Sequence, residues 1–391
     1  MLSNATLSYG ERAARALLGV DILYRRESKD EDGLVVVDMS LGALKPTPYT
    51  DYAEAIADWR ELKHDAASLP EADRRRYYDQ LCDSTLAFIQ WRSDGLAFAD
   101  QLSRFLHVSA APASTVELDG LCAELRTLLN TLGYTGDLEK QAAAWQERNR
   151  VPADEVADTL AALCDEAWNR TEQILHIPAP KSDGMQVVGV SGVAFNARCN
   201  YLARKVELNI DPVLTRPGLK HLAVHECYPG HYVQFKLRET FYAEGKAPAD
   251  NLLSVVNTAS SAPFEGIADH GLFLLDWIDS DDDRVQQALT RYRSGIGTVA
   301  AWRLHALGEP ENTVRDWLRS NALVGGEGWV DSRMRFIAAP ARSVLIWSYW
   351  FGQDAVTAAY NAIPPARRHD YLQYLYGRMH SLQTLSMYDA Q

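Results

Sequence analysis

The chain has 391 residues, 47% of them hydrophobic and 23% charged, which is typical of a soluble globular protein with a sizeable core. Lys plus Arg number 39 and Asp plus Glu 52, so the formal net charge is 39 − 52 = −13. This balance argues against the basic face that binds nucleic acid or anionic membranes, so we expect neither partner. The apolar runs LFLLDWI and VLIWSYWF are too short for a membrane span, which needs roughly 20 residues.

Two further features of the sequence bear on its location. The first residues, MLSNATLSYGERAARALL, lack the basic stretch and apolar core of a signal peptide. The five cysteines are scattered and form no C-x-x-C pair, which is typical of reduced thiols rather than of a disulfide framework or a thiolate zinc site. We therefore expect a cytoplasmic protein. The oligomeric state cannot be predicted from the sequence.

Residues 1–177 are expected to form an N-terminal helical region. In the segment 153–170, Val156, Leu160 and Leu163 recur at helical spacing, and Pro152 lies just upstream as a helix-start signal. The segments 73–94 and 115–134 have the same periodicity. The fold class predicted from these patterns is mainly α.

Residues 178–391 are expected to form a catalytic helical region with a β insert, in one compact unit with the N-terminal region. The segment 184–211 is rich in Val, Gly and Asn and ends in RKVELNI, which predicts a small hairpin or edge sheet. A helix should begin directly afterwards, with Thr215 as its N-cap and Pro217 in its first turn. Patterns typical of helices continue to the C-terminus and are interrupted by LVGGEGW and AIPPARR.

The segment VHECYPGHYVQ, residues 224–234, carries the residue types of a catalytic zinc site. Such a site needs three nitrogen or oxygen ligands, an open position and a base that accepts the proton of the attacking water. His225 and His231 are candidate ligands, and Glu226 is the candidate base. Downstream, APFEGIADHG offers Glu265 as a third ligand. Asp269, one helical turn later, is placed to orient a ligand histidine.

The spacing of the two histidines is unusual for a metal site. On an ideal helix, residues six apart point about 240° away from each other, so His225 and His231 would not face one metal. Pro229 lacks the N–H that would bond the helix, and Gly230 permits a backbone break, so the two rings could converge. The rival pair His221 and His225, four residues apart, would share a helix face without distortion.

The motif resembles the signature H-E-x-x-P-G-H-x-x-Q of the bacterial domain-of-unknown-function family 885, which is itself distantly similar to mostly helical zinc metallopeptidases of the oligopeptidase and carboxypeptidase type. The resemblance implies a helical gluzincin-like fold and a metal-dependent hydrolase. It covers roughly residues 185–391. The matching positions are His225, Glu226, Pro229, Gly230, His231 and Gln234, with weaker matches at Glu265, Gly266, Pro340, Tyr349 and Gly352.

The other candidate site residues have supporting roles. Tyr349 is a candidate donor to the oxyanion of the transition state. Arg342 and His380 are candidates to bind a substrate carboxylate. His221, Asp269 and Gln234 are candidates to hydrogen-bond to the metal ligands and orient them, or to contact the substrate.

The function predicted from this set is a zinc-dependent hydrolase of a peptide or amide bond, with water activated by the metal and by Glu226. The cofactor is inferred to be zinc, although another divalent metal is compatible with the same ligands. Two alternatives stay open: a metal-dependent enzyme acting on a small-molecule metabolite, and a non-catalytic helical scaffold with a decayed site.

Overall fold

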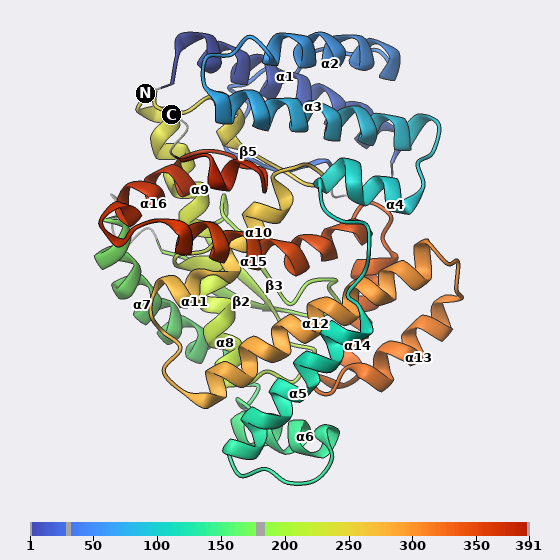
Figure 1. Cartoon of the computed structure of the whole chain (residues 1–391), viewed down its shortest axis with the longest axis vertical. Helices are drawn as coiled ribbons and strands as arrows, with labels where there is room; N and C mark the ends of the chain where they lie inside the picture. The colour runs from blue at the N-terminus through green and yellow to red at the C-terminus, as the bar shows by residue number, and fades with distance from the viewer. Residues whose placement is uncertain (1, 29–32, 177–183, 389–391) are drawn as a thin grey trace. The chain divides into compact units, whose positions relative to one another are not determined.

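The computed structural model describes residues 2–28, 33–176 and 184–388. Helices predominate in all of these segments, so the mainly α fold class is confirmed (Figure 1). The predicted boundary between residues 177 and 178 lies outside the described residues. Two compact units alternate along the chain. The first comprises Met1–Ala110, Val233–Ile267 and Phe351–Gln391, and the second comprises Ala111–Tyr232 and Ala268–Trp350.

The first unit is built on three long helices that pack side by side (Figure 1). Its N-terminal elements are α1 (Asn4–Glu27), β1 (Val35–Asp38), α2 (Tyr52–Ala66), α3 (Ala72–Ser93), α4 (Phe98–Gln101) and η1 (Leu102–Leu106). The remaining elements are most of α9 (His231–Ala243), η4 (Ala249–Leu252), β5 (Leu253–Val255), most of α10 (Ser261–Asp269), most of α15 (Ile346–Ala362), η6 (Pro365–Arg367), α16 (Arg368–Gly377) and η7 (Thr384–Ser386). β1 and β5 form an antiparallel pair that the sequence patterns do not predict.

Two glycines set the approach of α10 to α15 within the first unit. A Cβ atom on Gly266 would lie 2.2 Å from the carbonyl oxygen of Gly352, and one on Gly352 would lie 2.2 Å from the carbonyl oxygen of Ala262. Side chains at either position would therefore force the two helices apart. Gly266 follows Glu265 directly, so this contact fixes the backbone of the segment that carries the candidate third ligand.

The second unit contains a small sheet and the helices around it. Its elements are α5 (Thr115–Thr131), α6 (Leu138–Asn149), α7 (Val156–Leu175), β2 (Gln186–Val190), β3 (Ala197–Asn200), β4 (Lys205–Asn209), α8 (Arg216–Leu222), η3 (Ala223–Cys227), α11 (Gly271–Leu274), α12 (Asp281–His305), α13 (Glu311–Asn321), α14 (Gly326–Ala338) and η5 (Ser343–Leu345). The helix α12 packs against α5, α8, α13 and α14, and α7 packs against α8, η3 and β2.

The sheet of the second unit confirms the predicted β insert and extends it. β3 and β4 form an antiparallel hairpin, and β2 adds to the other side of β4 in parallel, giving the order β2-β4-β3. Val206 and Leu208 of β4 are fully buried, as expected for the central strand. Among the strands of the described residues, β3 lies at the edge of this sheet, and one of its sides pairs with no strand.

The helix signals in the sequence are confirmed at several boundaries. The periodic segments 73–94, 115–134 and 153–170 correspond to α3, α5 and α7. Thr215 caps α8, its side chain accepting a hydrogen bond from the Gly218 amide, and proline occupies the first turn. The predicted interruption at LVGGEGW separates α13 from α14, where Gly325 has a φ of 98°. No helix among the described residues is long and apolar enough to cross a membrane.

Candidate metal and catalytic site

The motif segment begins in an α-helix, continues through a π-helical turn and then leaves the helix. α8 leads into the π-helical turn η3, which carries both His225 and Glu226. The chain then passes through the cis Tyr228–Pro229 peptide bond and resumes as α9 at His231. The interruption predicted from Pro229 and Gly230 is therefore confirmed. The π-helical turn is a feature that no sequence pattern indicated.

Gly230 is required by the path of the backbone at this interruption. Its amide donates a hydrogen bond to the Val224 carbonyl oxygen at 2.9 Å. A Cβ atom on Gly230 would lie 1.8 Å from the carbonyl oxygen of His225, well inside contact distance. Because the obstructing atoms belong to the backbone, no side-chain rotation could relieve the clash. Glycine thus allows the chain to fold back over η3 before His231.

Replacing Gly230 with alanine should therefore damage both the fold and the site. We expect the free energy of unfolding to fall by about 1–3 kcal/mol, the usual cost of overpacking, because the α8–α9 connection must move. Urea denaturation followed by circular dichroism measures this change. Gly120→Ala is the matched control, because nothing lies within 4 Å of its Cβ position. Equal stability of the two variants would contradict the proposed role of Gly230.

The interruption brings the rings of His225 and His231 together. Their centroids are 4.6 Å apart and the ring planes are nearly perpendicular, at 82°. His225 Nδ1 lies 2.8 Å from Oδ1 of Asp269, and both side chains are buried. A carboxylate bonded to one ring nitrogen fixes the tautomer and leaves the other nitrogen, Nε2, as a metal ligand. This is the orienting role predicted for Asp269, and the distance is compatible with it.

His221 also lies close to these residues. Its ring centroid is 5.6 Å from that of His225, and its Nε2 lies 3.6 Å from Oδ1 of Asp269, which is too long for a hydrogen bond. Burial lowers the pKa of His221 to about 4, so the ring is neutral at pH 7 and can bind a cation. His221, His225 and Asp269 each offer a ligand atom within 4.8 Å of the others. The rival pair, His221 and His225, therefore forms with Asp269 a second possible set of three metal ligands.

Glu226 connects the motif to the edge strand. Its Oε2 accepts a hydrogen bond from the Cys199 amide at 2.7 Å, and the side chain is 5% exposed. The N–H of Cys199 therefore points away from β4. Alternate residues of a strand direct their backbone groups to the same side, so Ala197 presents its N–H and carbonyl on the edge that faces Glu226. An extended ligand could pair with these groups.

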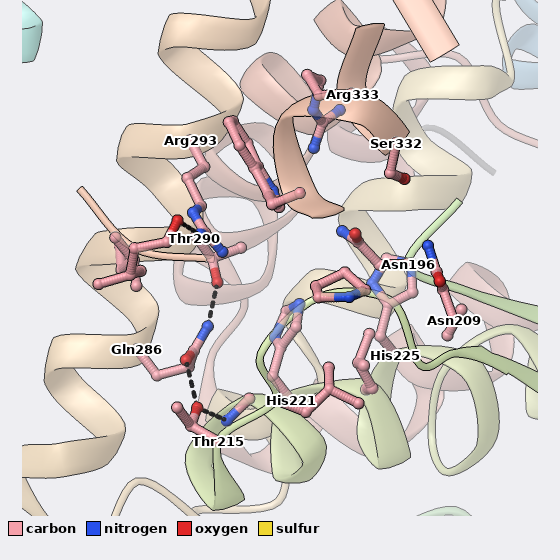
Figure 2. A pocket seen from close by; sticks show the side chains of 18 of the residues that line it. Asn196, Asn209, Thr215, His221, His225, Gln286, Thr290, Arg293, Ser332 and Arg333 are labelled. Carbon is pink, nitrogen blue, oxygen red and sulfur yellow. Dashed lines mark hydrogen bonds between the residues drawn. The ribbon is translucent and has the colours of Figure 1, made fainter. Parts of the chain in front are cut away.

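A pocket of about 180 Å³ opens beside these residues within the second unit. One wall carries His221, His225, Glu226 and Asp269, and the Ala194–Ala197 segment forms a second. Figure 2 shows His221 and His225 on the lower side of this pocket, with Asn196 and Asn209 beside them. The pocket is smaller than typical drug-binding sites, which enclose roughly 300–1,000 Å³.

Tyr349 lies in the same pocket as the motif histidine. Its ring is stacked on that of His225, with centroids 6.3 Å apart and planes at 24°. Phe336 is a further aromatic neighbour, with its ring centroid 6.4 Å from that of Tyr349. The oxyanion-donor role of Tyr349 stays a prediction, and its place in the pocket is compatible with that role.

The opposite wall of the pocket comes from helices far from the motif segment in sequence. α12 supplies Gln286, Thr290 and Arg293, and α14 supplies Trp329 and Arg333. A hydrogen-bonded chain from Thr215 through Gln286 to Thr290 connects the start of α8 to α12 (Figure 2). These residues lie about 60–110 positions from the motif in sequence and form no local pattern, so only the tertiary structure brings them to it.

Glu265 and Gln234 belong to the first unit. Glu265 lies on α10, four residues before Asp269 and therefore on the same face of that helix. Gln234, on α9, donates a hydrogen bond from Nε2 to the Phe264 carbonyl at 3.0 Å. Gln234 thus holds the backbone immediately before Glu265. The ligand role of Glu265 stays a prediction.

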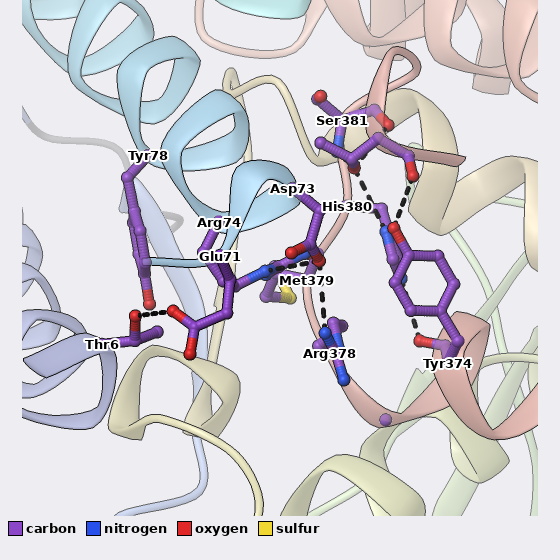
Figure 3. Close-up of polar contacts among 12 residues, drawn as sticks. Thr6, Glu71, Asp73, Arg74, Tyr78, Tyr374, Arg378, Met379, His380 and Ser381 are labelled. Carbon is purple, nitrogen blue, oxygen red and sulfur yellow. Dashed lines mark hydrogen bonds and ion pairs between the residues drawn. The ribbon is translucent and has the colours of Figure 1, made fainter. Parts of the chain in front are cut away.

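His380 and Arg342 have other surroundings. In the first unit, His380 Nδ1 lies 3.1 Å from the Thr384 hydroxyl and Nε2 lies 3.0 Å from the Tyr374 carbonyl (Figure 3). These contacts explain the burial of His380 without a ligand. Arg342 precedes η5 in the second unit and is absent from the described lining of the pocket. A substrate-binding role for either residue stays a prediction.

A buried ionic cluster accompanies His380 in the first unit. Arg74 bonds both Asp73 and the Met379 carbonyl, and Arg378 also reaches Asp73 (Figure 3). Burial alone would raise the pKa of Asp73, but the two guanidinium groups outweigh it and hold that pKa below its usual value. Burial and then the charge of Arg74 lower the pKa of His380 to about 3, so this histidine is neutral.

Three buried cysteines lie near the motif. Cys164 and Cys227 have sulfur atoms 3.5 Å apart, and Cys199 lies on β3. All three side chains are buried, and burial raises the pKa of the Cys199 and Cys227 thiols well above its usual value. Both thiols are therefore protonated at neutral pH.

The solved structures similar to this chain include two that cover most of its length. The first is described as a "putative lipoprotein" from Colwellia psychrerythraea, with a TM-score of 0.57 and 13% sequence identity, covering 85% of this chain and 65% of that one. The second, a "putative lipoprotein of unknown function" from Shewanella oneidensis, has a TM-score of 0.53 and 11% identity, covering 87% and 71%. The chain thus spans slightly less than two thirds of the first. At these identities the likeness shows the fold alone.

The sequence comparisons add no further relative. No family model matches the chain. No curated protein matches it. The resemblance to domain-of-unknown-function family 885 therefore rests on the motif residues alone.

Proposed function

We propose that this protein is a metal-dependent hydrolase, with zinc as the metal, that cleaves a peptide or amide bond. The observation that carries this proposal is the chain interruption at Tyr228–Gly230, after which the His231 ring lies 4.6 Å from that of His225. The neighbouring residue, Glu226, faces the same pocket as His225. His225 and Glu226 line the pocket and His231 lies next to His225, and two histidines with a carboxylate are the elements of a zinc hydrolase.

The donor chemistry fits zinc. The proposed ligands are His225, His231 and Glu265, a set of two imidazoles and one carboxylate of the kind that catalytic zinc sites use. Asp269 supports this choice, because its bond to Nδ1 of His225 leaves Nε2 for the metal. Asp269 also supports Glu265, since the two carboxylates lie one turn apart on α10 and point to the same side of that helix.

In the proposed reaction, the residues of this chain bind the substrate and move one proton. A bound zinc ion supplies Lewis-acid polarisation of the substrate carbonyl and lowers the pKa of water. Glu226 accepts the proton of the attacking water and returns it to the leaving amine. Tyr349 donates a hydrogen bond to the oxyanion that develops on the carbonyl. The edge of β3 at Ala197 holds an extended substrate through backbone hydrogen bonds.

The proposed fold type is that of the helical metallopeptidases, as the resemblance to family 885 implies.

A second candidate function is a metal-dependent reaction on a small-molecule metabolite. The small volume of the pocket, about 180 Å³, favours it. The proposed location is the cytoplasm, supported by five cysteines that are all free thiols.

The metal content of the purified protein tests the proposal. Protein prepared without chelators is expected to contain about one equivalent of zinc, or to take it up on addition, because the rings of His225 and His231 already lie together in the fold. Inductively coupled plasma mass spectrometry measures this content. Less than about 0.1 equivalent of any transition metal, with no uptake, would instead support a non-catalytic scaffold.

A further inference from the structure

Two arginines, Arg293 of α12 and Arg333 of α14, stand in the pocket wall that faces the histidines. Figure 2 shows both on the upper side of the view, with His221 and His225 below them. The carboxylates in the described lining of this pocket are Glu226 and Asp269, and both are engaged on the histidine side. The arginine side of the pocket therefore carries two positive charges without a neighbouring carboxylate from the described lining.

The guanidinium groups are only partly satisfied by the protein. Arg293 donates through Nη2 to the Val324 carbonyl. Its Nε, and the Nε of Arg333, are buried and have no hydrogen-bond partner among the described residues. Leaving a buried charged donor unsatisfied is costly, and such groups in proteins are normally paired. Both side chains line the pocket, so an anion there would pair with the guanidinium nitrogens that reach the lining rather than with these buried Nε atoms.

The electrostatics of the pair agree with this interpretation. Burial and then the nearby charge of Arg333 lower the pKa of Arg293 to about 9, and burial lowers the pKa of Arg333. At pH 7 Arg293 still carries its charge, although its surroundings oppose it. An anion in the pocket that these arginines line would offset this opposition, so the pair favours a negative ligand.

The two side chains are also held in place by packing. Both guanidinium groups lie against the buried ring of Trp329, with their central carbons 4.6 Å (Arg293) and 5.4 Å (Arg333) from its centroid. Gly325 lies so close that a Cβ there would approach Nη2 of Arg293 to 2.4 Å. Side chains restrained in this way lose little conformational freedom when they bind a ligand.

We propose that Arg293 and Arg333 bind a carboxylate of the substrate, so that the substrate is a short peptide with a free C-terminus or an N-acylated amino acid. The pocket joins these arginines to His225 and Glu226, and its volume of about 180 Å³ suits a small ligand. Guanidinium groups pair with carboxylates through two parallel hydrogen bonds. The substrate class rests on the hydrolase function proposed above, whereas carboxylate binding by the two arginines does not.

Isothermal titration calorimetry with a matched ligand pair tests this subsite. The ligands are 3-phenylpropionate and its uncharged carboxamide, with inorganic phosphate as a second anion. We expect the wild-type protein to bind the carboxylate at least about 10-fold more tightly than the carboxamide, and Arg293→Gln or Arg333→Gln to abolish this difference. Arg335→Gln is the control, because this arginine lies on the same helix but is exposed. Arg333→Lys should retain part of the preference, which guards against a loss caused by misfolding.

The outcomes separate this subsite from the metal site. Equal affinity for carboxylate and carboxamide, or an equal effect of Arg335→Gln, would overturn the proposal. Tighter binding of phosphate than of 3-phenylpropionate would overturn the assignment of a carboxylate. The metal-deficient variant His231→Ala should keep the preference for the carboxylate; its loss there would show that a metal, rather than the arginines, binds the ligand. Arginine-dependent binding by a protein without metal would refute the hydrolase and leave the subsite standing.

Discussion

Glu226→Gln is expected to retain the fold and one equivalent of zinc but to lose turnover by a factor of ~10²–10⁴, the usual contribution of a general base. The amide has nearly the same shape as the carboxylate, yet it cannot accept the proton of the attacking water. Hydrolysis of a panel of dipeptides and N-acetylated amino acids measures the loss. Metal content and thermal unfolding, measured on the same preparation, establish that only the base has changed.

Glu244→Gln is the matched control for this experiment, because it makes the same chemical change at an exposed position outside the described lining of the pocket. It should hydrolyse the panel at the wild-type rate. A Glu226→Gln variant as active as the wild type would refute the assignment of the base, whereas the metal site would stand. Loss of zinc together with activity would indicate that Glu226 supports the metal ligands instead.

The second large effect is expected on metal binding. His231→Ala should abolish zinc uptake, because it removes one of three ligands, whereas His221→Ala should leave about one equivalent bound. The metal content of the two variants, dialysed against zinc and then against buffer, gives the comparison. The two substitutions remove the same group from histidines on either side of His225, so each serves as the control for the other.

The opposite result would identify a different metal site. If His221→Ala abolished zinc uptake and His231→Ala did not, the metal would be held by the cluster of His221, His225 and Asp269. Asp269 would then be a ligand rather than an orienting residue. Equal loss in both variants would require both histidines to contact the metal. Each outcome leaves His225 in the site, since it belongs to both candidate pairs.

Local signals in the sequence predicted the parts of the fold that local chemistry determines. The cap at Thr215, the break at Pro229–Gly230 and the interruption before α14 follow from side-chain hydrogen bonding and backbone freedom at single positions. The short pair of β1 and β5 was missed because strands of three or four residues carry too little alternation to detect. The parallel pairing of β2 was missed because it depends on contacts across the sheet.

The candidate site likewise contains residues that a local motif indicates and residues that only the tertiary structure brings together. His225, Glu226 and His231 lie within seven residues, so a motif could indicate them. The environment of His221 was beyond prediction, because its pKa of about 4 results from burial by distant parts of the chain. Arg293 and Arg333 resemble surface residues of amphipathic helices in the sequence. Only the packing of α12 and α14 places them in the pocket.

The hydrogen bond between Glu226 and the edge strand assigns different roles to the two oxygen atoms of one carboxylate. Oε2 is occupied by the Cys199 amide, so in the proposed reaction Oε1 would accept the proton. In Glu226→Gln, the same amide would select the orientation of the new side chain: its oxygen must face Cys199, and its NH₂ group must face the pocket. The variant would therefore present a donor where the wild-type protein presents an acceptor, and a substrate carbonyl could hydrogen-bond to it. Such an inactive protein would be suited to trapping an uncleaved substrate for structure determination.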